Sequence, residues 1–132
     1  MNSLVVAAIV EFGEKVLVGK KVECEHPAGL GGQWHLPGGR MEKGETPSQA
    51  IIREMKEETG LDVEIVDMLG AKKSGITGSI ILWFLCKADS AELRPDDDLE
   101  KAEWLTKKEV IERCPNVAKD AWSEEVWNFL KR

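Results

Sequence analysis

The chain has 132 residues, 42% hydrophobic and 32% charged, which is long enough for one domain with a core and too short for two ordinary domains. Its 24 acidic and 18 basic residues give a net charge of -6, the wrong sign for a surface that grips long nucleic acid. No apolar stretch approaches the roughly 20 residues of a membrane-spanning helix. We therefore expect a single soluble domain over residues 1–132, with neither a membrane nor long nucleic acid as a partner.

The N-terminal apolar run, residues 4–10, has no preceding basic cluster and no small-residue cleavage site, so it does not resemble a secretion signal. The cysteines are Cys24, Cys86 and Cys114. They are odd in number and form no CxxC pair, which argues against a disulfide framework and a structural zinc site. We expect a cytoplasmic protein.

In chain order, residues 4–11 and 15–20 are apolar, β-favouring runs joined by Phe12-Gly13-Glu14, a pattern typical of a hairpin. Residues 27–44 are rich in glycine and predict a loop, within which residues 33–36 have the composition of a short strand.

A helix with clear ends follows the loop. Thr46 suits the N-cap, Pro47 suits the first helical position, and Gln49 completes a capping box with Thr46. The helix is predicted to run to about Thr59, with Gly60 as its C-terminal glycine.

The next strands are predicted at residues 62–69, 79–86 and 102–105. The second of these is a nearly continuous apolar run, typical of a central strand covered on both faces. Trp83 and Phe84 are adjacent in it, so they must face opposite sides, and core packing is the expected role of both.

Thr106 and Glu109 form a second capping box, opening a short helix that Cys114-Pro115 ends. A last amphipathic helix is indicated by apolar residues at helical spacing: Trp122, Val126, Phe129 and Leu130. Strands and helices together predict an α/β sandwich.

Glu54, Glu57 and Glu58 share one face of the predicted first helix, where like charges repel. The last two also lie near the C-terminus of the helix, where its dipole disfavours acids. A divalent cation such as magnesium would reverse both penalties, because clustered carboxylates are its preferred ligands. The alternative is a solvated acidic face.

The spacing of these residues resembles the signature box of the Nudix hydrolase family. Gly39, five residues, Glu45, seven residues and then REMKEETGL at residues 53–61 reproduce that box without a departure. The preceding Leu36-Pro37-Gly38-Gly39 and the closing helix are also similar to the family. The resemblance implies a Nudix fold, an α/β/α sandwich around a mixed β-sheet, and hydrolysis of a diphosphate bond in a nucleotide.

The resemblance also implies roles for individual residues. The metal ligands would be Glu54, Glu57, Glu58 and the carbonyl of Gly38, with Mg²⁺ or Mn²⁺ as the ion. Glu57 or Glu58 would also position or deprotonate the attacking water. Glu45 and Arg53 would form a structural pair that holds the loop against the helix.

A further acidic ligand outside the box is common in the family, and we favour Asp98 from the group Asp96, Asp97, Asp98 and Glu100. An acidic turn after Arg94-Pro95 explains the same residues equally well. Lys20 and Lys21 are candidates for contact with the far phosphates, although exposed lysines at the end of a strand are ordinary.

Four more residues are candidates for substrate contact. Trp34 and His35 would stack on or hydrogen-bond a base, and Gly39 is one of the glycines that allow a backbone turn close to the metal. Asn116 would read a purine edge, or else serve as the N-cap of the last helix.

The proline typical of ADP-ribose hydrolases is missing around residues 76–78, and the chain has no tyrosine. We therefore expect a nucleoside or deoxynucleoside triphosphate pyrophosphohydrolase that releases a monophosphate and pyrophosphate, with removal of non-standard nucleotides as a role. The alternatives are a Nudix reaction on ADP-ribose, a sugar nucleotide or an RNA cap, and a non-catalytic nucleotide-binding module. A homodimer is expected only by analogy with the family.

Overall fold

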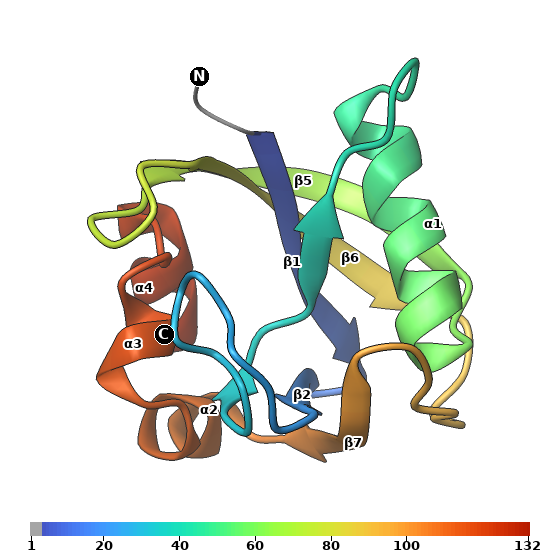
Figure 1. Cartoon of the computed structure of the whole chain (residues 1–132). Helices are drawn as coiled ribbons and strands as arrows, with labels where there is room; N and C mark the ends of the chain where they lie inside the picture. The colour runs from blue at the N-terminus through green and yellow to red at the C-terminus, as the bar shows by residue number, and fades with distance from the viewer. Residues whose placement is uncertain (1–3) are drawn as a thin grey trace.

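A mixed β-sheet forms the centre of the computed structural model, which describes residues 4–132 (Figure 1). Its strands in this range are β1 (Leu4–Phe12), β2 (Lys15–Lys21), β3 (Trp34–His35), β4 (Gly38–Arg40), β5 (Val63–Lys73), β6 (Ile80–Ala88) and β7 (Leu99–Leu105). The order is β3-β2-β1-β6-β5, with β4 paired to β1 and β7 paired to β2. Strands β1 and β6 run parallel, and the other pairs run antiparallel.

Helices cover both faces of this sheet (Figure 1). Helix α1 (Pro47–Thr59) lies on one face, and α2 (Lys107–Arg113), α3 (Asn116–Lys119) and α4 (Glu124–Leu130) lie on the other. Alternate residues of β1 point to opposite faces of the sheet. Val6 packs in the core under α1, and Ala7 packs in the core under α2–α4. The predicted α/β/α sandwich around a mixed sheet is therefore confirmed.

Strand β6 lies between β1 and β5, as its continuous apolar sequence predicts. Trp83 is 2% exposed and packs under α2–α4, where its indole Nε1 donates to the Ala121 carbonyl at 2.7 Å. Phe84 packs on the opposite face under α1. The predicted core roles of both aromatic residues are confirmed.

Helix α1 begins and ends where its sequence predicts. The Gln49 backbone N–H donates to Thr46 Oγ1 at 3.2 Å, and the Thr46 N–H donates to Gln49 Oε1 at 2.9 Å. Gly60 ends the helix in the left-handed region, at φ +77°. The helix buries Ala50 and Met55 against the sheet.

The predicted hairpin is also present, with Phe12 paired to Lys15 across a two-residue turn at Gly13, whose φ is +63°. The second capping box forms between Thr106 and Glu109. No helix in residues 4–132 has the length and apolar character needed to cross a membrane.

The sequence did not predict strand β4. Its three residues begin with two glycines, a composition typical of a loop. The glycines instead allow a close approach: Gly38 pairs with Ala7, and a Cβ on Gly38 would collide with the β1 backbone. The strand expected at residues 33–36 is correspondingly reduced to Trp34–His35.

Two strands extend at least three residues beyond their predicted ends, and the pairing register of each is shifted by a β-bulge or irregularity. Strand β5 continues beyond residue 69 to Lys73 through an irregular register near Gly70, and β7 starts at Leu99 rather than at residue 102. The extension of β7 brings Leu99 opposite Lys21.

The expected N-cap role of Asn116 is wrong. Asn116 is the first residue of the short helix α3, which the sequence did not predict, and Ser123 caps α4 by accepting from the Val126 N–H at 3.1 Å. Trp122 lies before this helix and not inside it. Two short helices separated by a turn therefore replace the single closing segment.

Candidate active site

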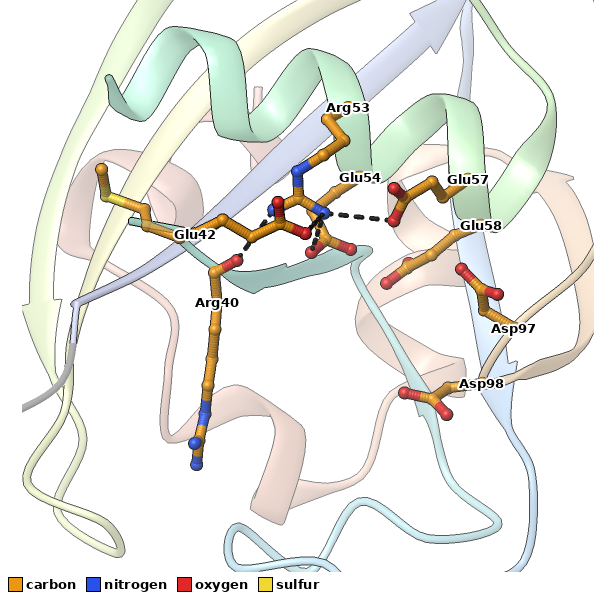
Figure 2. Close-up of a pocket in the computed structure, with 9 residues that line it drawn as sticks. Arg40, Glu42, Arg53, Glu54, Glu57, Glu58, Asp97 and Asp98 are labelled. Atoms are coloured by element: carbon orange, nitrogen blue, oxygen red, sulfur yellow. Dashed lines mark hydrogen bonds and ion pairs between the residues drawn. The ribbon is translucent and has the colours of Figure 1, made fainter. Parts of the chain in front are cut away.

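An open pocket of about 550 Å³ lies between α1, the end of β4 and the loop before β7 (Figure 2). Its lining residues come from three segments, the helix α1, strand β4 with the loop after it, and the loop before β7. They are Arg40, Met41, Glu42, Arg53, Glu54, Glu57, Glu58, Asp97 and Asp98. The structure thus brings the three predicted glutamates together with the predicted Asp98.

Arg53 ties the loop before α1 to the helix. Its Nε donates to Glu45 Oε2 at 2.6 Å, and its Nη2 donates to Glu45 Oε1 at 3.0 Å and to the Arg40 carbonyl at 3.1 Å. This two-pronged bond lowers the pKa of Glu45 and raises that of Arg53. The sequence-predicted partners Glu45 and Arg53 are therefore in direct contact.

The remaining nitrogen of Arg53 faces the acids of the pocket (Figure 2). Arg53 Nη1 lies 3.1 Å from Glu54 Oε1, 3.1 Å from Glu57 Oε2 and 3.5 Å from Glu42 Oε1. A single guanidinium nitrogen thus serves three carboxylates, which leaves the pocket with an excess of negative charge.

Glu58 is the buried acid of the pocket, in the part of the chain that the structure describes. It is 7% exposed, and its Oε2 is buried without a hydrogen-bond partner in the described part of the chain. Burial, followed by the neighbouring Glu54 carboxyl, raises the pKa of Glu58 to about 9. Burial also raises the pKa of Glu54, against the opposing effect of Arg53.

Gly39 explains how Glu54 fits beside β4. A Cβ at residue 39 would collide with the Glu54 carboxylate in the position where Arg53 holds it, and glycine avoids this collision. The neighbouring Gly38 pairs with Ala7 in the same strand and does not line the pocket. The proposed role of its carbonyl stays a prediction.

The acidic loop before β7 is held against the C-terminus of α1 by its backbone. The Asp96 N–H donates to the Glu58 carbonyl at 2.9 Å, and the Arg94 N–H donates to the Thr59 carbonyl at 2.9 Å. Asp97 follows with φ +53° and lines the pocket beside Asp98. Sequence reasoning named Asp97 among the candidate acids but favoured Asp98, because membership of the acidic run was the only signal of Asp97.

The two lysines have different positions. Lys21 Nζ forms an ion pair with Asp98 Oδ2 at 3.1 Å, at the edge of the pocket. Lys20 is paired with Trp34 on the strand and forms an ion pair with Glu100 at 3.7 Å. Neither Lys20 nor Glu100 lines the pocket.

Trp34 packs with the core under α2–α4, and the Arg113 guanidinium lies 5.0 Å from its ring centroid. Asn116 is exposed on α3. The structure brings neither of these two predicted substrate contacts to the glutamate pocket. Arg40, which the sequence did not single out, does line it, and its side chain extends away from the carboxylates (Figure 2).

The chemistry of the pocket fits a divalent cation. Its carboxylates are hard oxygen ligands, and the unpartnered Glu58 Oε2 is an oxygen that a cation would satisfy. Within residues 4–132, no three acidic, histidine or cysteine side chains are already spaced as ligands of one ion. Arg53 Nη1 instead contacts both Glu54 and Glu57.

A family profile described as NUDIX domain matches residues 1–127. The chain belongs to the NUDIX domain family. Within the family it is 40% identical over 86 residues to a MutT-like protein of Streptomyces ambofaciens, which is 65% of this chain and 56% of that protein. It is 34% identical over 93 residues to the NAD-capped RNA hydrolase NudC of Vibrio parahaemolyticus, or 70% of this chain and 36% of NudC.

A third relative, from Mycobacterium tuberculosis, is named as a candidate 8-oxo-dGTP diphosphatase and is 44% identical over 63 residues, 48% of this chain and 43% of that protein. The chain therefore spans little more than half the length of the MutT-like protein and less than half of the other two.

Solved NUDIX structures share the fold. A NUDIX hydrolase from Nitrosomonas europaea superimposes with a TM-score of 0.75 at 25% identity, over 100% of this chain and 70% of that one. An ADP-ribose pyrophosphatase from Streptococcus suis superimposes with a TM-score of 0.77 at 20% identity, over 99% of this chain and 91% of that one.

Proposed function

We propose that this NUDIX domain hydrolyses a diphosphate bond of a nucleoside or deoxynucleoside triphosphate, adding water to give a monophosphate and pyrophosphate. The observation that carries the proposal is the pocket along α1, in which the buried Glu58 has an unpartnered oxygen beside Glu54. Such an arrangement is unfavourable in isolation and becomes favourable with a bound cation.

Glu54, Glu57 and Glu58 would hold the cation, with Asp97 or Asp98 facing them from the opposite loop. Bound magnesium would neutralise phosphate charge and lower the pKa of a coordinated water. We assign Glu57 as the general base that accepts the proton of the attacking water. Its side chain is 46% exposed, so solvent reaches it. Arg53 would orient Glu54 and Glu57 while its other edge stays bound to Glu45.

The names of the relatives support a nucleotide substrate and differ on which one. The MutT-like protein and the candidate 8-oxo-dGTP diphosphatase favour a triphosphate and a role in removing oxidised nucleotides. NudC, which matches a longer stretch of this chain, favours the second candidate, hydrolysis of a nucleotide cap on RNA. The Streptococcus suis structure has the same fold and a different named substrate, ADP-ribose.

The same proposal includes a setting for the enzyme. The described cysteines are all free, two of them buried, which fits a reducing cytoplasm. A homodimer is proposed by analogy with the family alone, and sedimentation of the purified protein tests it.

A screen of nucleotides with Mg²⁺ tests the proposed reaction, with phosphate and pyrophosphate measured separately. We expect pyrophosphate from triphosphates, no turnover in EDTA, and a loss of roughly 10²-fold or more in Glu57→Gln. Glu58→Gln should be similarly impaired while its circular dichroism is unchanged. AMP released from ADP-ribose with triphosphates intact would instead support the alternative substrates, and saturable binding without turnover would support a binding module.

A further inference from the structure

His35 lies on the sheet face that carries α1, and the pocket residue Asp98 is close enough to influence its pKa. It is paired with Gly19 of β2, and the neighbouring Leu17 of β2 packs in the core under α1. A Cβ on Gly19 would meet the Leu99 side chain at 2.8 Å. Gly19, the strand partner of His35, therefore packs against Leu99, the residue that follows the pocket residue Asp98.

The hydrogen bonding of its ring defines one tautomer. His35 Nδ1 lies 2.9 Å from the Leu36 carbonyl oxygen, which can only accept, so Nδ1 carries a hydrogen. Burial lowers the pKa of His35 and keeps the ring neutral near pH 7. Nε2 is then a lone-pair acceptor, and it is buried without a hydrogen-bond partner in the described residues.

The polar groups around His35 do not supply the missing donor. Those close enough to alter its proton affinity are Lys21, His26 and Asp98. Lys21 is bound to Asp98 at 3.1 Å, and His26 Nδ1 accepts from the Ala28 N–H at 3.1 Å. An unpaired buried acceptor is unfavourable, so a donor from outside the protein would stabilise it.

We propose that His35 Nε2 accepts a hydrogen bond from a donor on the organic part of the nucleotide substrate, a base N–H or a sugar hydroxyl, and selects nucleotides that carry it. The inference rests on the proposed function and adds a residue that discriminates among its substrates. Substrate phosphate would offer Lys21, which is bound to Asp98 in this structure, a second partner. A site built around a buried acceptor rejects analogues that lack the donor, because the acceptor is then left unpaired.

Pairs of triphosphates that differ in one donor test the assignment. GTP and ITP differ in the exocyclic amino group, and each ribonucleotide differs from its deoxynucleotide in the 2′-hydroxyl. We expect wild-type kcat/KM to fall roughly 10-fold to 10²-fold on the analogue that lacks the donor. His35→Leu should lose this preference, and His35→Gln, whose amide oxygen can accept, should retain part of it. His26→Asn is the matched control and should keep the wild-type preference, because its ring nitrogen is already occupied by Ala28.

Nitrogen NMR of the histidine side chains tests the hydrogen bond to His35 Nε2 directly. It uses the wild-type protein and needs no substrate turnover. We expect Nδ1 protonated and Nε2 unprotonated in the free protein, and a shift of Nε2 when a non-hydrolysable nucleoside triphosphate binds with Mg²⁺. Three results would overturn the assignment: a protonated Nε2, no Nε2 shift at saturation, or an equal shift with inorganic tripolyphosphate. The absence of a shift would indicate that a buried water is the partner of Nε2.

The outcomes separate the two proposals. If wild type hydrolyses triphosphates and His35→Leu keeps every preference, this inference fails and the proposed function stands. If wild type hydrolyses none of them, the proposed function fails and the assignment of His35 fails with it.

Discussion

Glu58 makes the stability of the metal-free protein depend on pH. Its pKa is about 9 in the folded chain, against an ordinary value of 4.5. Because the folded pKa is raised, the stabilising contribution is complete below 4.5 and is lost as the pH rises through about 9. We predict that the free energy of unfolding in EDTA falls between pH 6 and pH 9, as measured by urea denaturation.

Glu58→Gln is the matched variant for this experiment, since glutamine keeps the shape and cannot ionise. It should remove most of the fall with pH. An unchanged pH dependence in this variant would show that another group is responsible.

Gly39 should be intolerant of even one methyl group. Gly39→Ala places a Cβ into the Glu54 carboxylate, and displacement of a catalytic group by about 1 Å costs roughly 10²-fold in rate. We predict a loss of that order in kcat/KM on the best triphosphate. Lys43→Ala, at an exposed residue of the following loop, is the control and should keep wild-type activity; equal activity of both variants would contradict the packing argument.

Residues on one helix were predictable from the sequence, and residues brought in by other segments were not. Glu54, Glu57 and Glu58 share a face through helical spacing alone. Asp97 reaches the pocket because backbone hydrogen bonds dock its loop on α1, a contact with no side-chain signature. Trp34 shows the converse: its neighbours along the chain resemble a substrate loop, but strand alternation turns it to the sheet face opposite α1.

Helix α1 should depend measurably on its first turn. Thr46→Ala removes the acceptor for the Gln49 N–H, and loss of such a cap costs about 1 kcal/mol. We predict a destabilisation of that size in urea denaturation. Ser48→Ala, at an exposed position of the same turn, should change stability by less than about 0.5 kcal/mol, and equal effects of the two substitutions would refute a specific role for the cap.

Elements with local signals were well predicted, and those created by pairing were not. The capping boxes at Thr46 and Thr106 specify helix starts within four residues. Strand β4 exists only because β1 lies beside it, and β7 begins at Leu99 only because a bulge brings Lys21 opposite. Sequence patterns contain no direct record of such long-range partners.

The two cores share one sheet, so they should unfold together. Cys86 lies in the core under α1 and Cys114 in the core under α2–α4, and burial raises the pKa of each thiol to about 12. In a Cys24→Ser background, which removes the exposed thiol, we predict that both react with a thiol reagent at the same denaturant concentration. Cys114 reacting well before Cys86 would show independent units and contradict the expected single domain.

The loop before β7 is fastened to α1 by main-chain N–H and carbonyl groups, and these do not depend on which side chains the loop carries. Replacement of Asp97 by residues that tolerate its left-handed backbone, such as asparagine or glycine, can therefore keep the loop in place. A lineage can vary the ligands and the substrate range on this side of the cleft while the chemistry on the helix is inherited unchanged.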